Sequence, residues 1–157
     1  MSILVKVMYF MVFRLSLIIL LASMLSYCIY TNDWYKYKAQ YPHMSFEIYR
    51  VANFESYLKG LDKTVVLAII DHESAQTWRT TITNGYDDGL MQINRVHGVY
   101  NVFDIRVNIA YGCKYLKHCI DKKRGNLYIG IMAYNSGCNR KEYNNYGYLM
   151  AILNRLR

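Results

Sequence analysis

Residues 62–74 set the architecture of this chain and read Asp62-Lys63-Thr64-Val65-Val66-Leu67-Ala68-Ile69-Ile70-Asp71-His72-Glu73-Ser74. Asp62 is a favoured N-cap residue, and the apolar run after it predicts a helix that ends near Glu73. Val66, Ile70 and Glu73 lie on one face of this helix, so a carboxyl group shares the stripe that should point into the protein. Burial would raise the pKa of that group, as a general acid near neutral pH requires. The alternative is a helix-end Glu satisfied by a cap or by an Arg.

Glu73 also begins a series of four sequence blocks. They are Glu73-Ser74, Gly89-Leu90-Met91-Gln92, Asn108-Ile109 with Gly112 and Tyr115-Leu116, and Ala133-Tyr134-Asn135-Ser136-Gly137. In this order, over about residues 62–140, the blocks resemble the lytic transglycosylase domain, which is similar in fold to goose-type lysozyme. The resemblance implies that peptidoglycan glycan strands are the substrate. The ending Gln92-Ile93-Asn94 looks most like the small transglycosylases that accompany specialised secretion systems, so a cell-envelope secretion assembly is a further expected partner.

The resemblance implies that Glu73 is the catalytic residue of a lytic transglycosylase that needs no cofactor. Glu73 would protonate the leaving oxygen of the β-1,4 MurNAc-GlcNAc bond. It would then deprotonate the muramoyl 6-hydroxyl, which closes a 1,6-anhydromuramoyl end without water. Two other functions stay open: a hydrolytic lysozyme on the same scaffold, and a non-catalytic peptidoglycan-binding module of a secretion or phage assembly. A carboxyl group on an apolar face speaks against the binding module, since binding alone does not require it.

The motif positions also imply a set of substrate-binding residues: Ser74, Met91, Gln92, Tyr134 and Asn135. The Gln92 amide can donate and accept hydrogen bonds, which suits sugar hydroxyls and amides. A Tyr134 hydroxyl beside the catalytic carboxyl group could orient that group or contact the N-acetyl group of the substrate. The sequence is equally compatible with Met91 as core packing and with Ser74 as a support for the site.

Asp87 and Asp88 are the candidates for a second catalytic carboxylate, which a lysozyme acting by inversion needs to activate water. They follow Asn84-Gly85 in a turn-rich segment, where Asp often serves a local backbone role, and we favour this structural interpretation for both. No metal site is expected, because three histidines lack metal-ligand spacing to Cys or acidic residues: His72, His97 and His118.

Residues 1–30 resemble a secretory signal or an uncleaved membrane anchor. Lys6 and Arg14 give a basic start, and residues 15–25 carry no charge. No clean small-x-small cleavage site follows, and lipidation of Cys28 is a minor alternative because Tyr27 stands where small residues are usual. We expect an exported protein of the periplasm or cell envelope, with the inner membrane as a partner of this segment. Residues 31–45 are interpreted as a linker and residues 46–157 as the lysozyme-like domain.

Composition narrows the class of partner. The chain is 54% hydrophobic, but its long apolar material lies almost wholly before residue 31. Lys and Arg outnumber Asp and Glu by 19 to 11, which favours polyanionic partners. No nucleic-acid motif or dense basic run appears, so nucleic acid is not expected. Anionic cell-wall polymer or a membrane surface fits the charge.

The rest of the chain predicts a mainly α, lysozyme-like single domain. Apolar residues at helical spacing predict further helices at Phe46–Leu58, Asn108–Lys123, Asn126–Tyr134 and Glu142–Leu156. Asn84-Gly85 and the neighbouring β-branched residues allow a small hairpin within residues 76–88.

The cysteines leave two possibilities open. Cys113 and Cys119 lie on one predicted helix, roughly 9 Å apart along its axis, too far to bridge each other without unwinding. At most one of them pairs with Cys138 if the compartment is oxidising. Buried free thiols on the apolar stripe are the other interpretation.

Overall fold

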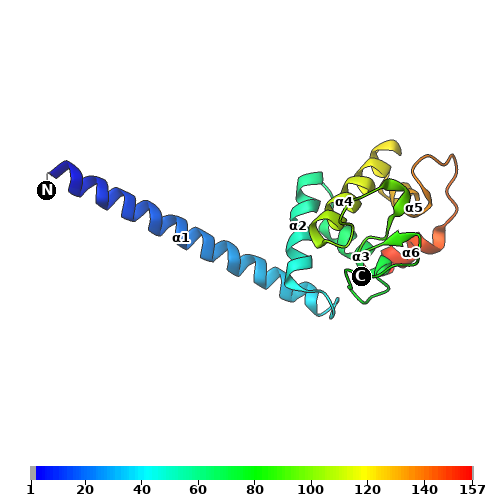
Figure 1. Ribbon diagram of the computed structural model, residues 1–157, viewed down its shortest axis with the longest axis horizontal. Helices are drawn as coiled ribbons and strands as arrows, with labels where there is room; N and C mark the ends of the chain where they lie inside the picture. Colours follow the sequence, from blue (N-terminus) through cyan, green and yellow to red (C-terminus); the bar gives the residue numbers. More distant parts are fainter. Residues whose placement is uncertain (1–2, 157) are drawn as a thin grey trace. The chain divides into compact units, whose positions relative to one another are not determined.

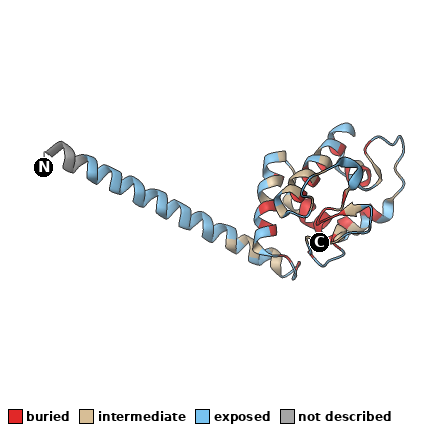
Figure 2. Cartoon of the chain, viewed as in Figure 1, coloured by how far each residue is buried: buried red, intermediate tan, exposed pale blue. Residues whose placement is uncertain are grey.

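The computed structural model describes residues 3–156 and divides after Gln40 into two units (Figure 1). The first unit contains one helix, α1 (Ile3–Lys38). Residues 8–30 are exposed (Figure 2), and Met8–Lys38 is long and apolar enough to cross a membrane. α1 continues to Lys38, so the first part of the segment expected to be a linker is helical. No Gly or Pro stands between residue 31 and Pro42, so no helix-breaking residue ends the helix earlier.

The second unit begins with two capped helices. α2 (Phe46–Lys59) starts after Ser45, whose Oγ accepts a hydrogen bond from Ile48 N at 3.2 Å. α3 (Lys63–Glu73) starts after Asp62, whose carboxylate accepts a hydrogen bond from Thr64 N at 2.8 Å. The predicted cap at Asp62 is therefore confirmed, and the helix ends at Glu73 as expected.

A small antiparallel hairpin follows, formed by β1 (Asp87–Asp88) and β2 (Ile93–Asn94). The prediction of a hairpin is confirmed: residues 89–92 connect β1 and β2, and an isolated antiparallel bridge between Thr83 and Asp88 closes a turn around Asn84-Gly85. In this turn Asn84 N donates to the Asp87 carbonyl at 3.2 Å. A 3-10 helix, η1 (Arg95–His97), directly continues β2.

Three further helices complete the unit: α4 (Ile105–Lys122), α5 (Leu127–Ser136) and α6 (Tyr146–Asn154). α4 begins at Ile105 rather than at Asn108, because Asp104 Oδ1 accepts hydrogen bonds from the backbone N–H groups of Arg106 and Val107. α6 is shorter at both ends than predicted. α3 packs against α2 and α6, while α4 packs against α2 and α5.

The core of the second unit is apolar and centres on α3, where residues 65–70 are all buried. The stripe predicted on α4 is also buried, namely Ile109, Gly112, Cys113, Leu116 and Ile120. The helix predicted at Phe46–Leu58 is confirmed as α2, although Phe54, Tyr57 and Leu58 in its second half are exposed. α2 carries apolar residues on more than one side, and its contacts with α3 and α4 select the side of Ile48 and Ala52. The fold is mainly α with one small hairpin.

Candidate active site

Glu73 is the last residue of α3 and lines a cavity of about 490 Å³. The other walls come from the hairpin, η1, α4 and the end of α5, with side chains that include Asp87, Gln92, His97, Tyr111, Tyr115, Tyr134 and Asn135. Directly after the helix, Ala75 and Gln76 adopt positive φ angles of 49° and 62°, which non-glycine residues seldom do. This tight turn takes the chain away from the cavity and leaves the carboxyl group at its wall.

Burial raises the pKa of Glu73 from 4.5 to about 7. Two neighbours modify this effect in opposite directions. Tyr148 Oη donates a hydrogen bond to Glu73 Oε1 at 2.6 Å, which lowers the pKa, and the charge of Asp87 raises it. The hydrogen-bond donor is a neutral phenol rather than a cation, so it does not force the carboxyl group to ionise. Near neutral pH the group can therefore both give and take a proton.

Tyr148 is the site residue that the sequence does not reveal. It lies on α6, 75 residues from Glu73, and is one of 17 tyrosines in the chain. Burial raises the pKa of Tyr148 well above 10, so the phenol remains a hydrogen-bond donor. Tyr134 also lines the cavity, but its hydroxyl donates to the Met91 carbonyl at 2.7 Å. The orienting contact that was one alternative for Tyr134 is thus made by Tyr148.

Gln92 and Asn135 both lie at the cavity wall and are accessible to solvent. Gln92 Nε2 donates to the Gly89 carbonyl at 2.9 Å, within the turn of the hairpin, and this fixes the direction of the side chain. Asn135 Oδ1 accepts a hydrogen bond from Asn145 Nδ2 at 2.6 Å. Each amide therefore has one end held by the protein, and both residues line the cavity, where an amide can bind a sugar.

Ser74 and Met91 lie behind the wall, where the structural alternatives left open for them, support of the site and core packing, fit their surroundings. Neither side chain has exposed surface, and neither lines the cavity. Ser74 Oγ accepts a hydrogen bond from Trp78 N at 3.2 Å and so supports the turn after Glu73. Met91 packs onto α4 at Gly112, where even an added Cβ would lie 2.3 Å from the Met91 sulfur. The apolar Met91 side chain is therefore part of the core.

The two acidic residues of β1 have different environments. Asp88 is buried and accepts hydrogen bonds from Arg95 Nε and Nη2 at 2.8 and 2.9 Å, which hold its pKa below the ordinary value. Asp87 lines the cavity, where Asn84 and Asn94 donate to its two carboxylate oxygens at 3.0 and 2.7 Å. The structural interpretation fits Asp88, whereas Asp87 faces the same cavity as Glu73.

A cluster of aromatic side chains forms the part of the cavity wall around α4. The His97 ring lies 5.5 Å from Tyr111 and 5.2 Å from Tyr115, and Tyr115 meets Tyr134 edge-to-face at 5.6 Å between ring centroids. Aromatic faces of this kind pack well against the apolar faces of sugar rings. Although the spacing of Tyr111 and Tyr115 places them on one side of a helix, the sequence does not show that His97 joins them.

The arrangement is a cleft with one buried carboxyl group, amides and aromatic rings. The family model "Transglycosylase SLT domain" matches residues 50–148, more than half of the chain. The chain belongs to this family. Members are lytic transglycosylases, so the match supports a peptidoglycan-degrading function at the cell envelope. The likeness to secretion-associated members stays a prediction. No solved structure matches the chain significantly.

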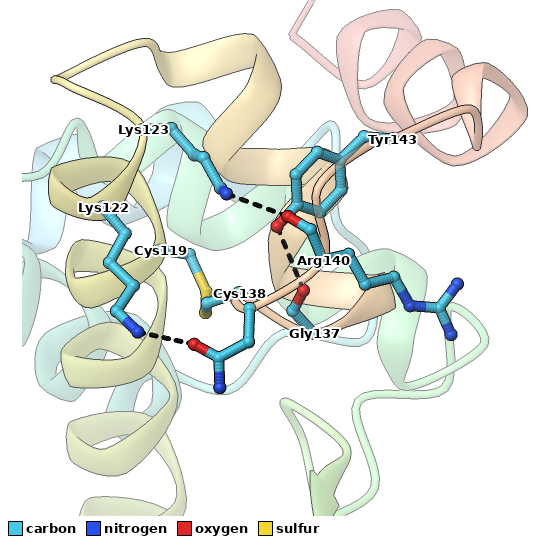
Figure 3. Close-up of a disulfide and its surroundings, with 8 residues drawn as sticks. Cys119, Lys122, Lys123, Gly137, Cys138, Arg140 and Tyr143 are labelled. Atoms are coloured by element: carbon cyan, nitrogen blue, oxygen red, sulfur yellow. Dashed lines mark hydrogen bonds between the residues drawn. A yellow bond between two sulfur atoms is a disulfide. The ribbon is translucent and has the colours of Figure 1, made fainter.

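One disulfide supports the rim of the SLT domain cleft (Figure 3). Cys119 on α4 bonds to Cys138, which directly follows the cavity residue Gly137, with a Cα–Cα distance of 5.0 Å. Tyr143 Oη donates to the Gly137 carbonyl at 3.2 Å and holds the same segment from the other side. The sequence left Cys113 and Cys119 as equal partners for Cys138. Cys113 is instead a buried free thiol, and burial raises its pKa to about 12.

Within residues 3–156, no three His, Cys, Asp or Glu side chains come together in a way that could hold a metal ion. Of the three histidines considered, His72 packs edge-on against Tyr148, with ring centroids 5.0 Å apart, and His97 belongs to the aromatic wall. His118 is exposed on α4.

Proposed function

We propose that this SLT domain protein cleaves the β-1,4 MurNAc-GlcNAc bond of peptidoglycan and forms 1,6-anhydromuramoyl ends, with Glu73 as both acid and base. The observation that carries this proposal is the state of Glu73: a carboxyl group at the cavity wall, with its pKa raised to about 7 and a neutral hydrogen-bond donor at 2.6 Å. The family assignment supports the reaction class.

In the first step, protonated Glu73 gives its proton to the oxygen that leaves from the muramoyl C1 atom. Tyr148 Oη donates its hydrogen bond to Glu73 Oε1, so Oε2 is the oxygen that remains to carry the transferred proton. The C1–O bond breaks and positive charge spreads over C1 and the ring oxygen. The Glu73 carboxylate formed in this step lies close to that charge and stabilises it.

In the second step, the Glu73 carboxylate takes the proton of the muramoyl 6-hydroxyl, and the 6-oxygen bonds to C1. Glu73 ends protonated, so the cycle closes without a cofactor and without net consumption of water. The 6-hydroxyl belongs to the bound sugar, and its effective concentration at C1 can far exceed that of a solvent competitor.

The role of Glu73 is tested by replacement. Glu73→Gln keeps the shape and the acceptor for Tyr148, and we expect bond cleavage on purified peptidoglycan to fall by roughly a hundredfold or more, since the proton donor is lost. Glu142→Gln is a matched control, because Glu142 is exposed and lies outside the cavity. Near-normal cleavage by folded Glu73→Gln would remove Glu73 from the mechanism.

Hydrolysis is the second candidate, and the position of Asp87 favours it. Asp87 shares the cavity with Glu73, and its charge acts on the Glu73 pKa, so it lies where a second carboxylate could activate water. Digestion in oxygen-18 water separates the two reactions. We expect anhydromuramoyl products without label by mass spectrometry. Label at the new muramoyl ends, and its loss in Asp87→Asn, would establish the lysozyme reaction instead.

We further propose that α1 holds the SLT domain to the inner membrane, with residues 41–157 on the outer side. The length and apolar composition of Met8–Lys38 support this placement. Full-length protein is expected in the membrane fraction, and a reporter fused after residue 157 is expected to be active only outside the cytoplasm. A reporter active only in the cytoplasm would contradict the placement, and a shortened soluble form would indicate cleavage.

A further inference from the structure

A buried polar cluster lies beside the catalytic residue but outside the cavity. Asp71, two residues before Glu73 on α3, is only 8% exposed. Its Oδ1 accepts a hydrogen bond from Trp78 Nε1 and its Oδ2 accepts one from Arg155 Nε, each at 2.8 Å. Burying such a pair costs desolvation energy that the attraction often fails to recover, so stability alone is a weak explanation for it.

Trp78 connects the cluster to the turn that follows Glu73. Ala75, Gln76 and Trp78 all have positive φ angles, so this turn is held in conformations that cost energy. Gln76 N donates to the Asp71 carbonyl at 2.7 Å, and the buried Trp78 indole donates to the Asp71 carboxylate. Asp71 therefore accepts both of these hydrogen bonds, which stabilise the strained turn, one through its carbonyl and one through its carboxylate.

Arg155 connects the cluster to α6. It is the C-cap residue of that helix, and its Nη1 donates to the Ala151 carbonyl at 2.8 Å. Tyr148 precedes Arg155 by about two helical turns, so both side chains extend from the same face of the helix. At the other end, Asn145 makes no side-chain cap hydrogen bond. α6 is thus joined to α3 by two polar contacts, Tyr148 to Glu73 and Arg155 to Asp71.

We propose that Asp71, Trp78 and Arg155 form a clamp that positions Tyr148 against Glu73. All three are positioning residues, because none of them lines the cavity. Tyr41 extends the clamp to the start of the domain: its hydroxyl donates to the Arg155 carbonyl at 3.1 Å, and its ring lies 5.3 Å from that of Trp78. The catalytic consequence rests on the proposed function, whereas the effect on the Glu73–Tyr148 contact does not.

The clamp is tested by titrating Glu73 in the full-length chain in detergent, with carbon-13 in the Glu carboxyl groups and NMR detection. The Glu73→Gln spectrum identifies the resonance. The titratable groups around Glu73 are Tyr148 on α6, Asp87 on β1, Tyr134 on α5 and the adjacent His72 on α3. The His72 ring packs against Tyr148, and the charges of Asp71 and Arg155 act on the pKa of His72 in both the parent chain and the Tyr148→Phe background. None of the groups around Glu73 is replaced in Asp71→Asn, which keeps an oxygen acceptor for Trp78 and removes the ion pair with Arg155.

Asp71→Asn can change the pKa of Glu73 in two ways, and these two changes have opposite signs. Loss of a nearby negative charge alone would lower the pKa of Glu73, whereas loss of the Tyr148 hydrogen bond would raise it. If the clamp positions Tyr148, we expect the pKa of Glu73 to rise by about half to one pH unit. A fall or no change would overturn the proposal.

A double-mutant cycle shows whether the effect passes through Tyr148. Asp71→Asn is expected to raise the pKa of Glu73 in the parent chain but not in a Tyr148→Phe background, where no hydrogen bond is left to lose. A rise of the same size in both backgrounds would mean that Asp71 acts without Tyr148 and would overturn the clamp. Ile152→Val, a buried α6 substitution that spares the clamp, is the control for lost stability and is expected to leave the pKa unchanged.

A second variant keeps the test decisive if Asp71→Asn does not fold. Arg155→Lys retains a cation near Asp71 but cannot reproduce the two hydrogen bonds that Arg155 donates. We expect a smaller rise of the Glu73 pKa in this variant, and an unchanged value would overturn the proposal. The proposed function fails separately, through normal cleavage activity of Glu73→Gln, and that result leaves the titration unaffected.

Discussion

Glu73 at the end of α3 and Asp88 on β1 are both carboxyl groups withdrawn from bulk water, yet their environments have opposite effects on their pKa values. Glu73 receives one hydrogen bond from a neutral phenol, and burial raises its pKa to about 7. Asp88 receives two hydrogen bonds from a guanidinium group, and its pKa is lowered. Burial is the largest cause of the raised pKa of Glu73, whereas the hydrogen bonds from Arg95 are the largest cause of the lowered pKa of Asp88, so only Glu73 can carry a proton near neutral pH.

The same difference separates a reactive position from a structural one. A carboxylate paired with Arg95 stays charged and holds β1 and η1 together, but it has no proton to give. Burial makes the Glu73 carboxyl group costly to ionise, and the hydrogen bond from the neutral phenol offsets only part of that cost, so the group is available for proton transfer near neutral pH. Four measurements test this contrast, and each of them changes one of the two carboxyl groups or a neighbour of Glu73.

The largest effect on stability is expected for Glu73→Gln. The folded-state pKa of Glu73 is raised above the unfolded value of 4.5, so the native state loses stability as pH rises between about 4.5 and 7. The neutral amide avoids that loss, and we expect a free energy of unfolding higher than wild type by about 1–2 kcal/mol at pH 8. Denaturant titrations at pH 4 and pH 8 should show the gain only at pH 8. A difference in unfolding free energy between variant and wild type that is the same at pH 4 and at pH 8 would contradict the raised pKa of Glu73.

The opposite sign is expected for Asp88→Asn. The folded-state pKa of Asp88 is depressed, so its contribution is present above the unfolded pKa and is lost as pH falls through the folded value. Because the Arg95 side chain is 56% exposed, solvent screens the pair, and we expect a loss of only about 1 kcal/mol at pH 7. Chemical denaturation should show the wild-type advantage narrowing at acid pH. An advantage that grows at acid pH would refute this assignment.

Tyr148→Phe removes the hydrogen bond that favours ionised Glu73. The pKa of Glu73 should rise, and the alkaline limb of the pH profile of kcat/KM should move to higher pH by about half to one pH unit. Tyr146→Phe is a suitable control, because Tyr146 lies on the same helix and is exposed. A limb that moves to lower pH, or does not move, would show that Tyr148 does not act on the ionised form.

The smallest effect is expected for Asp87→Asn. The charge of Asp87 raises the pKa of Glu73, so its removal should move the same alkaline limb to lower pH by a few tenths of a pH unit. The shift should shrink at high salt, because solvent ions screen charges near the surface. A change in the rate without any shift of the profile would indicate that Asp87 acts on the substrate instead.

Local sequence patterns were sufficient for the elements that depend on neighbours along the chain. The Asp62 cap and the apolar run after it predicted α3 and its end at Glu73, because capping and helical periodicity act over a few residues. The buried stripe of α4 followed from the same periodicity. Periodicity alone did not select the buried side of α2, since that helix has apolar residues on more than one side and its contacts with α3 and α4 decide which side is covered.

The family blocks located Glu73, Gln92, Tyr134 and Asn135 at one cavity, as the structure shows. The blocks alone do not separate wall from core: they contain Met91 and Ser74 as well, and both of these side chains are buried. A motif records that a residue is needed at a position. Which way its side chain faces depends on what packs against it, and here α4 packs against Met91 through Gly112.

The sequence alone determined that Glu73 ends a capped helix, that the domain is mainly α and that the N-terminal segment is apolar. The folded chain was needed to select Tyr148 from 17 tyrosines, Cys119 rather than Cys113 as the partner of Cys138, and Arg155 as the partner of Asp71. The physical reason is the range of the interactions. Caps and helical stripes join residues within a few positions, whereas the contacts at this site join residues 19 to 84 positions apart, and no local pattern encodes such pairs.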